Sequence, residues 1–385
     1  MPLSSAALEP LLRLSTVPGI GPGRLAQLLR RFGSAERVMA ASEAEVGELP
    51  GFGAELVRRV SEASGTRARE RTAQAMERLE KVGAVALTPD DRAYPDAFRT
   101  LADAPFLLFA SGDLALLGRP AVGIVGTREP TPYGRETAGR LAGDLARAGY
   151  AVVSGMAKGI DASAHAGALA AGGDTVGVLG HGIDRVYPRE NARLFEAMRE
   201  RGLLLTELPP GEEPRAGNFP RRNRLISALS EGVLVVEMAA KSGAQHTVTY
   251  ALEQGKEVFA VPGPIGSAVS AGTNQLLKEG ARLVTSAADV LEELRGVGRA
   301  APVGSRPAPQ LPPDLEADLG PEPVEPDGLS AEEAKTWAVL GREPLHVDEV
   351  AAAAGLAPSG VLAALLGLEL RDVVESLPGK RFRRR

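Results

Sequence analysis

The segment AVGIVGTREPTPYG (Ala121–Gly134) joins a short apolar run to a glycine turn and then to a helix-start pattern. The run is apolar throughout rather than alternating, which is typical of a parallel strand covered on both faces. Gly126 permits a tight turn, and Thr131 followed by Pro132 suits the first turn of a helix. The segment therefore predicts the first strand, turn and helix of an α/β domain.

Similar apolar runs recur along the chain and alternate with helical stretches. They are Tyr150–Gly155, Thr175–Gly180, Leu203–Glu207, Gly232–Glu237 and Glu257–Gly263. The helical connections between them are long enough for βαβ crossovers. We therefore expect residues 82–295 to form an extended Rossmann-like domain with a doubly wound, mostly parallel sheet. Ligands on such sheets bind beyond the carboxyl ends of the strands.

The sequence pattern of the first 75 residues predicts short helices, and this region contains two related segments. VPGIGPGRLAQLL (Val17–Leu29) and LPGFGAELVRRV (Leu49–Val60) both place Pro-Gly, an apolar residue and Gly before a helical pattern. The glycines permit tight turns and bring N–H groups to a helix start, where a phosphate can bind. Residues 1–75 therefore resemble a tandem helix-hairpin-helix (SAM-like) domain that contacts double-stranded DNA. The alternative is a helical packing domain with glycine turns.

The C-terminal part divides into a linker and a small domain. Residues 296–328 are rich in Pro, Ala, Asp and Glu, and we expect an extended or disordered linker there. In residues 329–385, two helical patterns are followed by VVESLPGKRFRRR, which suits a β-hairpin wing. We expect a winged-helix domain that binds either DNA or a protein partner.

Composition narrows the class of protein. The net charge is −5 and there are no cysteines, which excludes disulfides, thiolate zinc sites and a cysteine nucleophile. No 18-residue apolar span or signal-peptide pattern is present. We expect a cytoplasmic protein without a membrane partner. If it binds nucleic acid, local basic patches must provide the contacts.

The turn after the second strand run is SGMAKGIDASAHAGAL (Ser154–Leu169). Its glycines favour a turn that presents backbone N–H groups to an anion, and Lys158 adds a positive charge. Asp161 suits the first turn of the following helix, where a carboxylate is stabilised. His165 lies four residues later and is expected to pair with Asp161 or to pack. These two residues do not make a metal site.

The segment FPRRNRLISALS (Phe219–Ser230) concentrates cations before an apolar helix. Arg221 and Arg224 are expected to bind phosphates, and Phe219 to stack on a base. Helical phase predicts that Arg222 points away. The alternative is that these arginines lie at a solvent-exposed helix start and form salt bridges with the nearby glutamates. Because glycines or cationic side chains follow several of the predicted strands, the pattern predicts that this edge of the sheet binds a polyanion.

These motifs together resemble the bacterial DNA-processing protein A (DprA/Smf) family. The resemblance spans nearly the whole α/β domain and rests on six motifs. They are VGTREPTPYG, SGMAKGIDASAHAGAL, VLGHGIDRVYPRENARLF, TELPPGEEPRAGNFPRRNRLISALS, VVEMAAKSGAQHTVTYALEQG and VFAVPGPIGSAVSAGTNQLLKEGA. Two departures from the family pattern are Thr127, where many members have Ser, and Gln245-His246, where apolar residues are usual.

The resemblance implies a non-enzymatic role in natural transformation. Members bind incoming single-stranded DNA, load the RecA recombinase onto it, help displace single-strand-binding protein and form homodimers through the α/β domain. Carried onto this chain, the DNA pocket uses Arg128, Ser154, Gly155, Lys158, Phe219, Arg221, Asn223 and Arg224.

Two other functions remain open at this stage. One is a nucleotide-hydrolysing Rossmann-like enzyme, but no G-x-S-x-G elbow, metal cluster or G-x-G-x-x-G fingerprint is present. The other is a protein-interaction scaffold built on the two end domains. We expect no catalytic residue, no metal and no cofactor.

Overall fold

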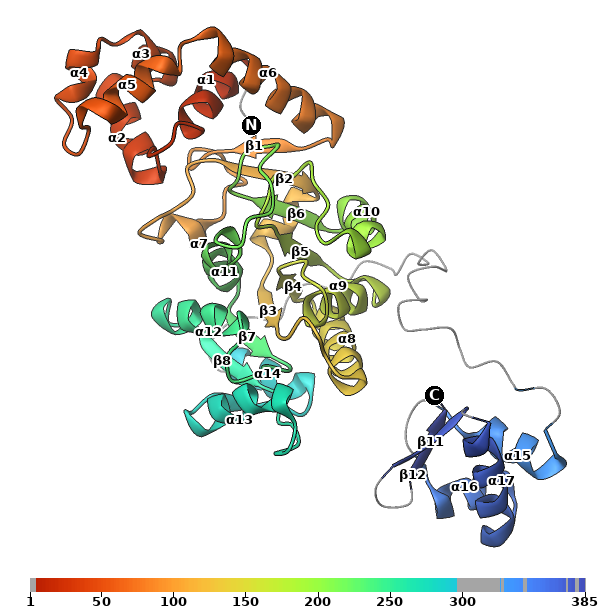
Figure 1. The fold of residues 1–385 in the computed structure, drawn as a ribbon. Helices are drawn as coiled ribbons and strands as arrows, with labels where there is room; N and C mark the ends of the chain where they lie inside the picture. The colour runs from red at the N-terminus through yellow and green to blue at the C-terminus, as the bar shows by residue number, and fades with distance from the viewer. Residues whose placement is uncertain are drawn as a thin grey trace. The chain divides into compact units, whose positions relative to one another are not determined.

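The structure is a computed structural model that describes residues 5–295, 326, 329–341, 345–371, 373–377 and 381–384. The chain forms two compact units, residues 1–311 and 312–385, and each is described by itself (Figure 1). Apart from Pro326, the predicted linker (residues 296–328) lies outside the described residues.

The N-terminal residues form a helical module that leads into the sheet. Its helices are α1 (Ser5–Ser15), α2 (Pro22–Phe32), α3 (Ala35–Ala40), α4 (Glu43–Gly47), α5 (Ala54–Glu62) and α6 (Thr66–Lys81). Both predicted hairpins are present: Gly19 and Gly51 have φ of 95° and 81°, and helices begin directly after Gly21 and Gly53. Ile20 and Phe52 between the glycines are buried, which fixes each turn.

A nine-stranded sheet follows, in the order β1-β2-β6-β5-β4-β3-β7-β8-β9. Its strands are β1 (Val85–Leu87), β2 (Leu108–Gly112), β3 (Ala121–Val125), β4 (Ala151–Ser154), β5 (Thr175–Val178), β6 (Leu203–Thr206), β7 (Gly232–Val235), β8 (Glu257–Ala260) and β9 (Arg282–Leu283). The predicted strands are confirmed as the parallel block β6-β5-β4-β3-β7-β8. Strands β1 and β2, which were not predicted, extend it in antiparallel fashion.

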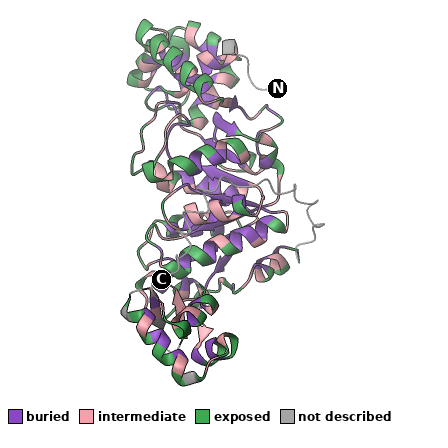
Figure 2. Ribbon diagram, turned by 90° about the vertical axis from the view of Figure 1, so that its right-hand side faces the viewer, coloured by how far each residue is buried: buried purple, intermediate pink, exposed green. Residues whose placement is uncertain are grey.

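Helices cover both faces of this sheet, so its strands are buried apart from the exposed edge strand β9 (Figure 2). The helices are α7 (Asp96–Arg99), α8 (Pro132–Arg147), α9 (Ile160–Ala170), α10 (Ala192–Arg201), α11 (Asn218–Leu229), α12 (Ala244–Glu253), α13 (Ala271–Lys278) and α14 (Ala287–Arg295), with 3-10 turns η1 (Leu114–Gly118), η2 (Arg189–Asn191) and η3 (Ala268–Ser270). Helices α8, α9 and α14 share one core cluster, whereas α11, α12 and α13 share the other. The doubly wound fold class is confirmed.

The second unit is a winged helix with its own core. It contains α15 (Ala331–Val339), β10 (Leu345–His346), α16 (Val347–Ala354), α17 (Pro358–Leu370), β11 (Val374–Leu377) and β12 (Arg381–Arg384). The wing strands β11 and β12 pair in antiparallel fashion, as predicted. In the described ranges no single helix is long and apolar enough to cross a membrane. The bent pair α16–α17 passes on length and composition only, and Val350, Val361 and Leu365 of this pair lie in the core of this unit.

Helices α8 and α9 approach closely because glycines face each other at their crossing. A Cβ atom added at Gly167 would lie 2.6 Å from the Cα of Gly139, inside the other helix's backbone. Gly167→Ala should therefore lower stability by about 1–3 kcal/mol, since overpacking forces backbone shifts. Thermal unfolding followed by circular dichroism measures the change in midpoint.

Gly23→Ala in α2 is the matched control, because open space surrounds that position. It should leave the midpoint unchanged or raise it, since alanine favours helix by about 1 kcal/mol. Equal midpoints for Gly167→Ala and the parent protein would show that the crossing tolerates the methyl group.

Candidate functional site

The candidate site is a crevice at the switch point of the sheet, where β3 lies between β4 and β7 and the strand order reverses. It is a hollow of about 540 Å³ at the carboxyl ends of the parallel strands. The loops after β3, β4, β5, β6 and β7 and the helices α9 and α11 line it. The lining residues include Gly126, Arg128, Ala157, Asp161, Tyr187, Phe219, Arg222, Asn223, Lys241, Ser242 and Gly243. A smaller hollow of about 60 Å³ adjoins it and is lined by Arg128, Gly155, Lys158, Gly180, Tyr187, Phe219 and Arg222, among others.

The start of helix α8 is closed by a carboxylate of the chain itself. Glu237, buried at the end of β7, accepts hydrogen bonds from the Thr131 N–H (2.9 Å) and hydroxyl (2.6 Å). Thr131 in turn caps the helix by accepting from the Gly134 N–H at 3.1 Å. Gly134 is needed because a Cβ there would lie 2.9 Å from Glu237 Oε1. The Glu237 carboxylate therefore already occupies the position at this helix start where an anion is stabilised by the helix dipole.

The turn after β4 is closed in the same way by Asp161 in the first turn of α9. Its carboxylate accepts from the N–H groups of Gly155 (3.1 Å) and Ala157 (3.3 Å). Burial raises the pKa of Asp161, and the charge of Arg222 opposes that rise. The prediction that this turn offers free N–H groups to an external anion is wrong for Gly155 and Ala157, because Asp161 occupies them.

Arg222 lies in the wall of the crevice, so the prediction that it points away is wrong. It shares one helical face with Leu225 and Ile226, which pack on the sheet. Its Nη1 donates to the carbonyl oxygens of Gly155 (2.7 Å) and Val178. Burial lowers the pKa of Arg222 to about 10, which leaves the guanidinium charged at neutral pH.

Gly155 is the residue that lets Arg222 lie beside Asp161. A Cβ at position 155 would lie 2.6 Å from Arg222 Nη2 and 2.7 Å from Asp161 Oδ2. Ser154, also predicted for the site, is fully buried below it and donates to the Ile124 carbonyl at 2.6 Å. The structure therefore places Ser154 in the sheet rather than in the crevice.

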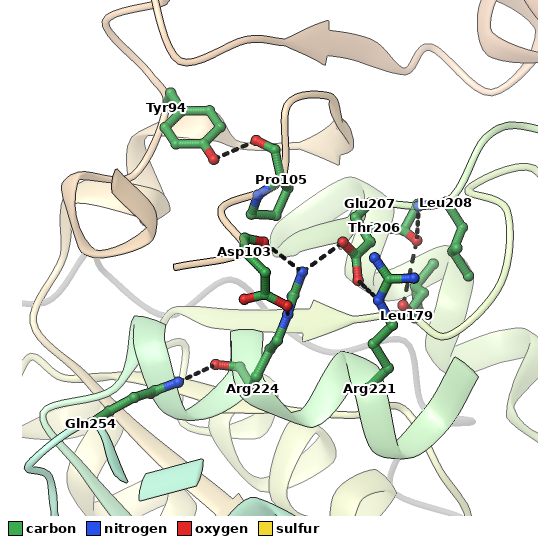
Figure 3. A network of polar contacts seen from close by, with 10 residues as sticks. All are labelled: Tyr94, Asp103, Pro105, Leu179, Thr206, Glu207, Leu208, Arg221, Arg224 and Gln254. Carbon is green, nitrogen blue, oxygen red and sulfur yellow. Dashed lines mark hydrogen bonds and ion pairs between the residues drawn. The ribbon is translucent and has the colours of Figure 1, made fainter. Parts of the chain in front are cut away.

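Arg224 was predicted to bind phosphate at the crevice, and the structure corrects this placement. Its buried guanidinium lies between two carboxylates: Nε is 2.7 Å from Asp103 Oδ2, and Nη2 is 2.8 Å from Glu207 Oε2 (Figure 3). Arg221 is half exposed and lies 3.7 Å from the same Glu207. It lines a separate hollow with Ile20 and Leu25 of the helical module. Neither arginine lines the crevice.

The other predicted residues do line the two hollows. Arg128 is exposed and its guanidinium carbon lies 5.6 Å from the centre of the Phe219 ring. Asn223 accepts from Arg222 Nε at 3.2 Å and lines the main crevice. Lys158 lines the smaller hollow and forms an ion pair with Glu190.

Lys241, which sequence reasoning missed, follows β7 and is exposed in the crevice wall. The available signal was a lysine within the loop that leaves a predicted parallel strand, in MAAKSG. Within residues 5–295, neither Arg128 nor Lys241 has a carboxylate within ion-pair distance. Both cations are therefore unneutralised at the mouth of the crevice. The predicted helix start at Ser242-Gly243 is also present, as the beginning of α12.

His165 has a structural role. It is fully buried, and its Nδ1 lies 2.7 Å from Thr175 Oγ1, whose hydroxyl donates to the Val152 carbonyl. Burial lowers the pKa of His165 to about 3, so the ring is neutral at physiological pH. Among the described residues, no group of three or more His, Cys, Asp or Glu side chains is placed to hold a metal.

The fold and the crevice define a class of protein: a doubly wound α/β domain with a cationic, aromatic crevice at its switch point, in a chain that also carries helix-hairpin-helix and winged-helix modules. A family model described as "DNA recombination-mediator protein A" matches residues 85–295, more than half of the chain. The chain belongs to this family, which confirms the resemblance read from the sequence. Models for a SAM-like helix-hairpin-helix tandem and a DprA winged helix domain match residues 11–64 and 306–380.

Two relatives agree with this assignment, and one of them aligns along nearly the whole length of the chain. Protein Smf of Synechocystis is 34% identical over 389 aligned residues, covering 96% of this chain and 97% of the relative. DNA processing protein DprA of Bacillus subtilis is 45% identical over 204 residues, covering 53% of this chain and 69% of the relative.

Two solved structures share the fold. The structure of DNA processing protein A from Streptococcus pneumoniae has a TM-score of 0.64 at 32% identity and covers 76% of this chain and 99% of that one. A structure from Helicobacter pylori, reported for its single-stranded DNA binding mode, has a TM-score of 0.50 at 34% identity, covering 55% of this chain and 96% of that one.

Arg224→Ala should destabilise the fold by about 3–5 kcal/mol, because it removes the buried partner of Glu207 and leaves that carboxylate only the half-exposed Arg221 at 3.7 Å. Arg221→Ala removes a half-exposed partner of the same carboxylate and should change stability by less than about 1 kcal/mol. Thermal unfolding of the two variants measures the change in stability that each substitution causes. A similar loss of stability in the two variants would show that the burial of Arg224 does not determine its contribution to stability.

His165 should make stability depend on pH. Its pKa of about 3 in the folded state lies below the value near 6.5 in the unfolded chain, so only the unfolded chain binds the proton between these values. Stability is therefore complete above pH 6.5 and falls by about 1.4 kcal/mol per pH unit below it. Denaturant unfolding between pH 7 and 5 should show a shallower slope for His165→Gln than for the parent. Identical slopes would contradict a neutral buried histidine.

Proposed function

We propose that this chain binds single-stranded DNA in the crevice and acts as a recombination mediator. The observation that carries the proposal is the pair of unneutralised cations, Arg128 and Lys241, at the mouth of a crevice whose wall contains the buried charge of Arg222. The Helicobacter pylori relative, reported for its single-stranded DNA binding mode, supports it.

Side chains rather than helix starts would hold the DNA backbone. Asp161 already accepts the N–H groups of Gly155 and Ala157 in the turn before α9, and Glu237 accepts the N–H of Thr131 at the start of α8. The phosphates are therefore left to Arg128, Lys241 and Arg222, with Asn223 as a neutral donor on the same wall. Such contacts read no base edges, so we expect binding without strong sequence preference.

The family resemblance extends the proposal to partners. We infer that the chain forms a homodimer, loads RecA onto the bound strand and helps displace single-strand-binding protein. RecA-dependent strand exchange on DNA coated with single-strand-binding protein tests the loading step. Acceleration by this chain supports it, and an unchanged rate with intact DNA binding rejects loading while leaving DNA binding in place.

Arg128→Ala and Lys241→Ala should each weaken binding of a fluorescent oligo(dT) severalfold, measured by anisotropy, because each removes one unneutralised cation. The parent's affinity should fall with salt, with a log–log slope of about −0.7 per phosphate neutralised, and each variant should reduce that slope.

Arg92→Ala is the matched control. Arg92 is an exposed arginine in a hollow at the opposite, amino ends of β3 and β7, so its loss should leave affinity unchanged. Unchanged affinity in both crevice variants, or an equal loss in the control, would reject the crevice as the binding site.

A further inference from the structure

Five side chains form a continuous row of tilted and edge-to-face contacts that runs from the buried Phe195 to the crevice. Ring centres are separated by 6.0 Å between Phe195 and His181, by 6.2 Å between His181 and Tyr187, and by 5.6 Å between Tyr187 and Phe219. The Arg128 guanidinium continues it over Phe219 at 5.6 Å. These rings come from α10, the loop after β5 and α11, so residues distant in sequence build one aromatic wall.

The loop that carries Tyr187 is anchored on both sides. Asn191 donates from its side-chain amide to the carbonyl oxygens of Met156 (3.0 Å) and Ala157 (3.2 Å), which ties the loop to the turn after β4. His181 contacts the Tyr187 ring edge to face, and burial lowers the pKa of His181 from its ordinary value. Tyr187 is therefore held in place before any ligand arrives.

Phe219, the residue predicted to stack on a base, is partly enclosed by its neighbours. A Cβ atom at Gly180 would lie 2.7 Å from Phe219 Cδ1, so the backbone of that turn presses on the ring. Tyr187 and Arg128 contact it as well. Tyr187 itself is 41% exposed, and among the Phe, Tyr and Trp residues of the range 5–295 only Tyr133 is exposed to a similar degree.

We propose that Tyr187 is a base-stacking residue of the crevice, with Phe219 as the ring that supports it. The inference rests on the proposed function and adds a contact with a base to the contacts with phosphates. One nucleobase of a single strand stacks on Tyr187, while Arg128 and Lys241 bind the neighbouring phosphates. Every base has a π-face, so this contact suits a sequence-tolerant binder. An exposed aromatic ring next to unneutralised cations is the arrangement that single-strand grooves require.

The first test compares variants by anisotropy with oligo(dT). Tyr187→Ala should weaken binding about tenfold, whereas Tyr187→Phe, which keeps the ring, should stay within about twofold of the parent. Tyr133→Ala is the matched control: its ring is 49% exposed but lines a separate hollow with Pro262 and Pro264. If Tyr187→Ala unfolds at a lower temperature than the parent, Tyr187→Leu replaces it in the assay, because leucine fills the space without an aromatic face.

The second test separates stacking from a structural role of the loop. A series of oligo(dT) strands, each with one abasic site, should reveal a position where loss of the base weakens binding by the parent. In Tyr187→Ala the same abasic site should cost nothing, because the ring that the base contacted is gone. An unchanged abasic penalty in this variant, or parent-like affinity, would overturn the inference. If the parent itself does not bind the strand, the proposed function fails, and the inference fails with it.

Discussion

The carboxyl edge of the sheet depends on two buried carboxylates. Asp161 and Glu237 accept the backbone N–H groups of the turns on either side of the switch point, at Gly155, Ala157 and Thr131. Without Asp161 the buried N–H of Gly155 would be unpaired, at a cost of about 1–3 kcal/mol. The partly buried N–H groups of Ala157 and Thr131 would also lose their partners. Because the carboxylates fix the turns, Arg128 and Arg222 have defined positions. Because these carboxylates already accept the backbone N–H groups, an incoming anion must be bound by side chains.

The arginines of the segment FPRRNR divide into different environments, although they are neighbours in sequence. Arg224 is buried between carboxylates and connects α11 to the segments before β2 and after β6. Arg222 is buried against backbone carbonyls in the crevice wall, and Arg221 faces the helical module. A buried charge is tolerated only when paired or hydrogen-bonded, and each buried arginine here satisfies that condition differently.

Much of the fold was predictable, because buried parallel strands require continuous apolar runs between helical crossovers. The runs around Val122, Val152, Val176, Leu204, Val233 and Phe259 show this pattern, and all form strands. Strands β1, β2 and β9 were missed: β1 and β9 span two or three residues, and β2 pairs in antiparallel fashion at the margin of the sheet. In the crevice, Arg128, Phe219 and Asn223 were placed correctly from their positions at strand ends.

The sequence by itself determined the fold class, the family and the edge of the sheet where the crevice lies, because periodicity and strand-end motifs are local properties of the chain. The tertiary structure alone decided which cations face the crevice. Helix α11 is buried on more than one side: the consecutive residues from Leu225 to Ala228 are all buried, so the sequence pattern does not show which side of the helix faces solvent. Whether an arginine there meets a carboxylate or the open crevice depends on Asp103, Glu207 and Gly155, which reach it only through the fold.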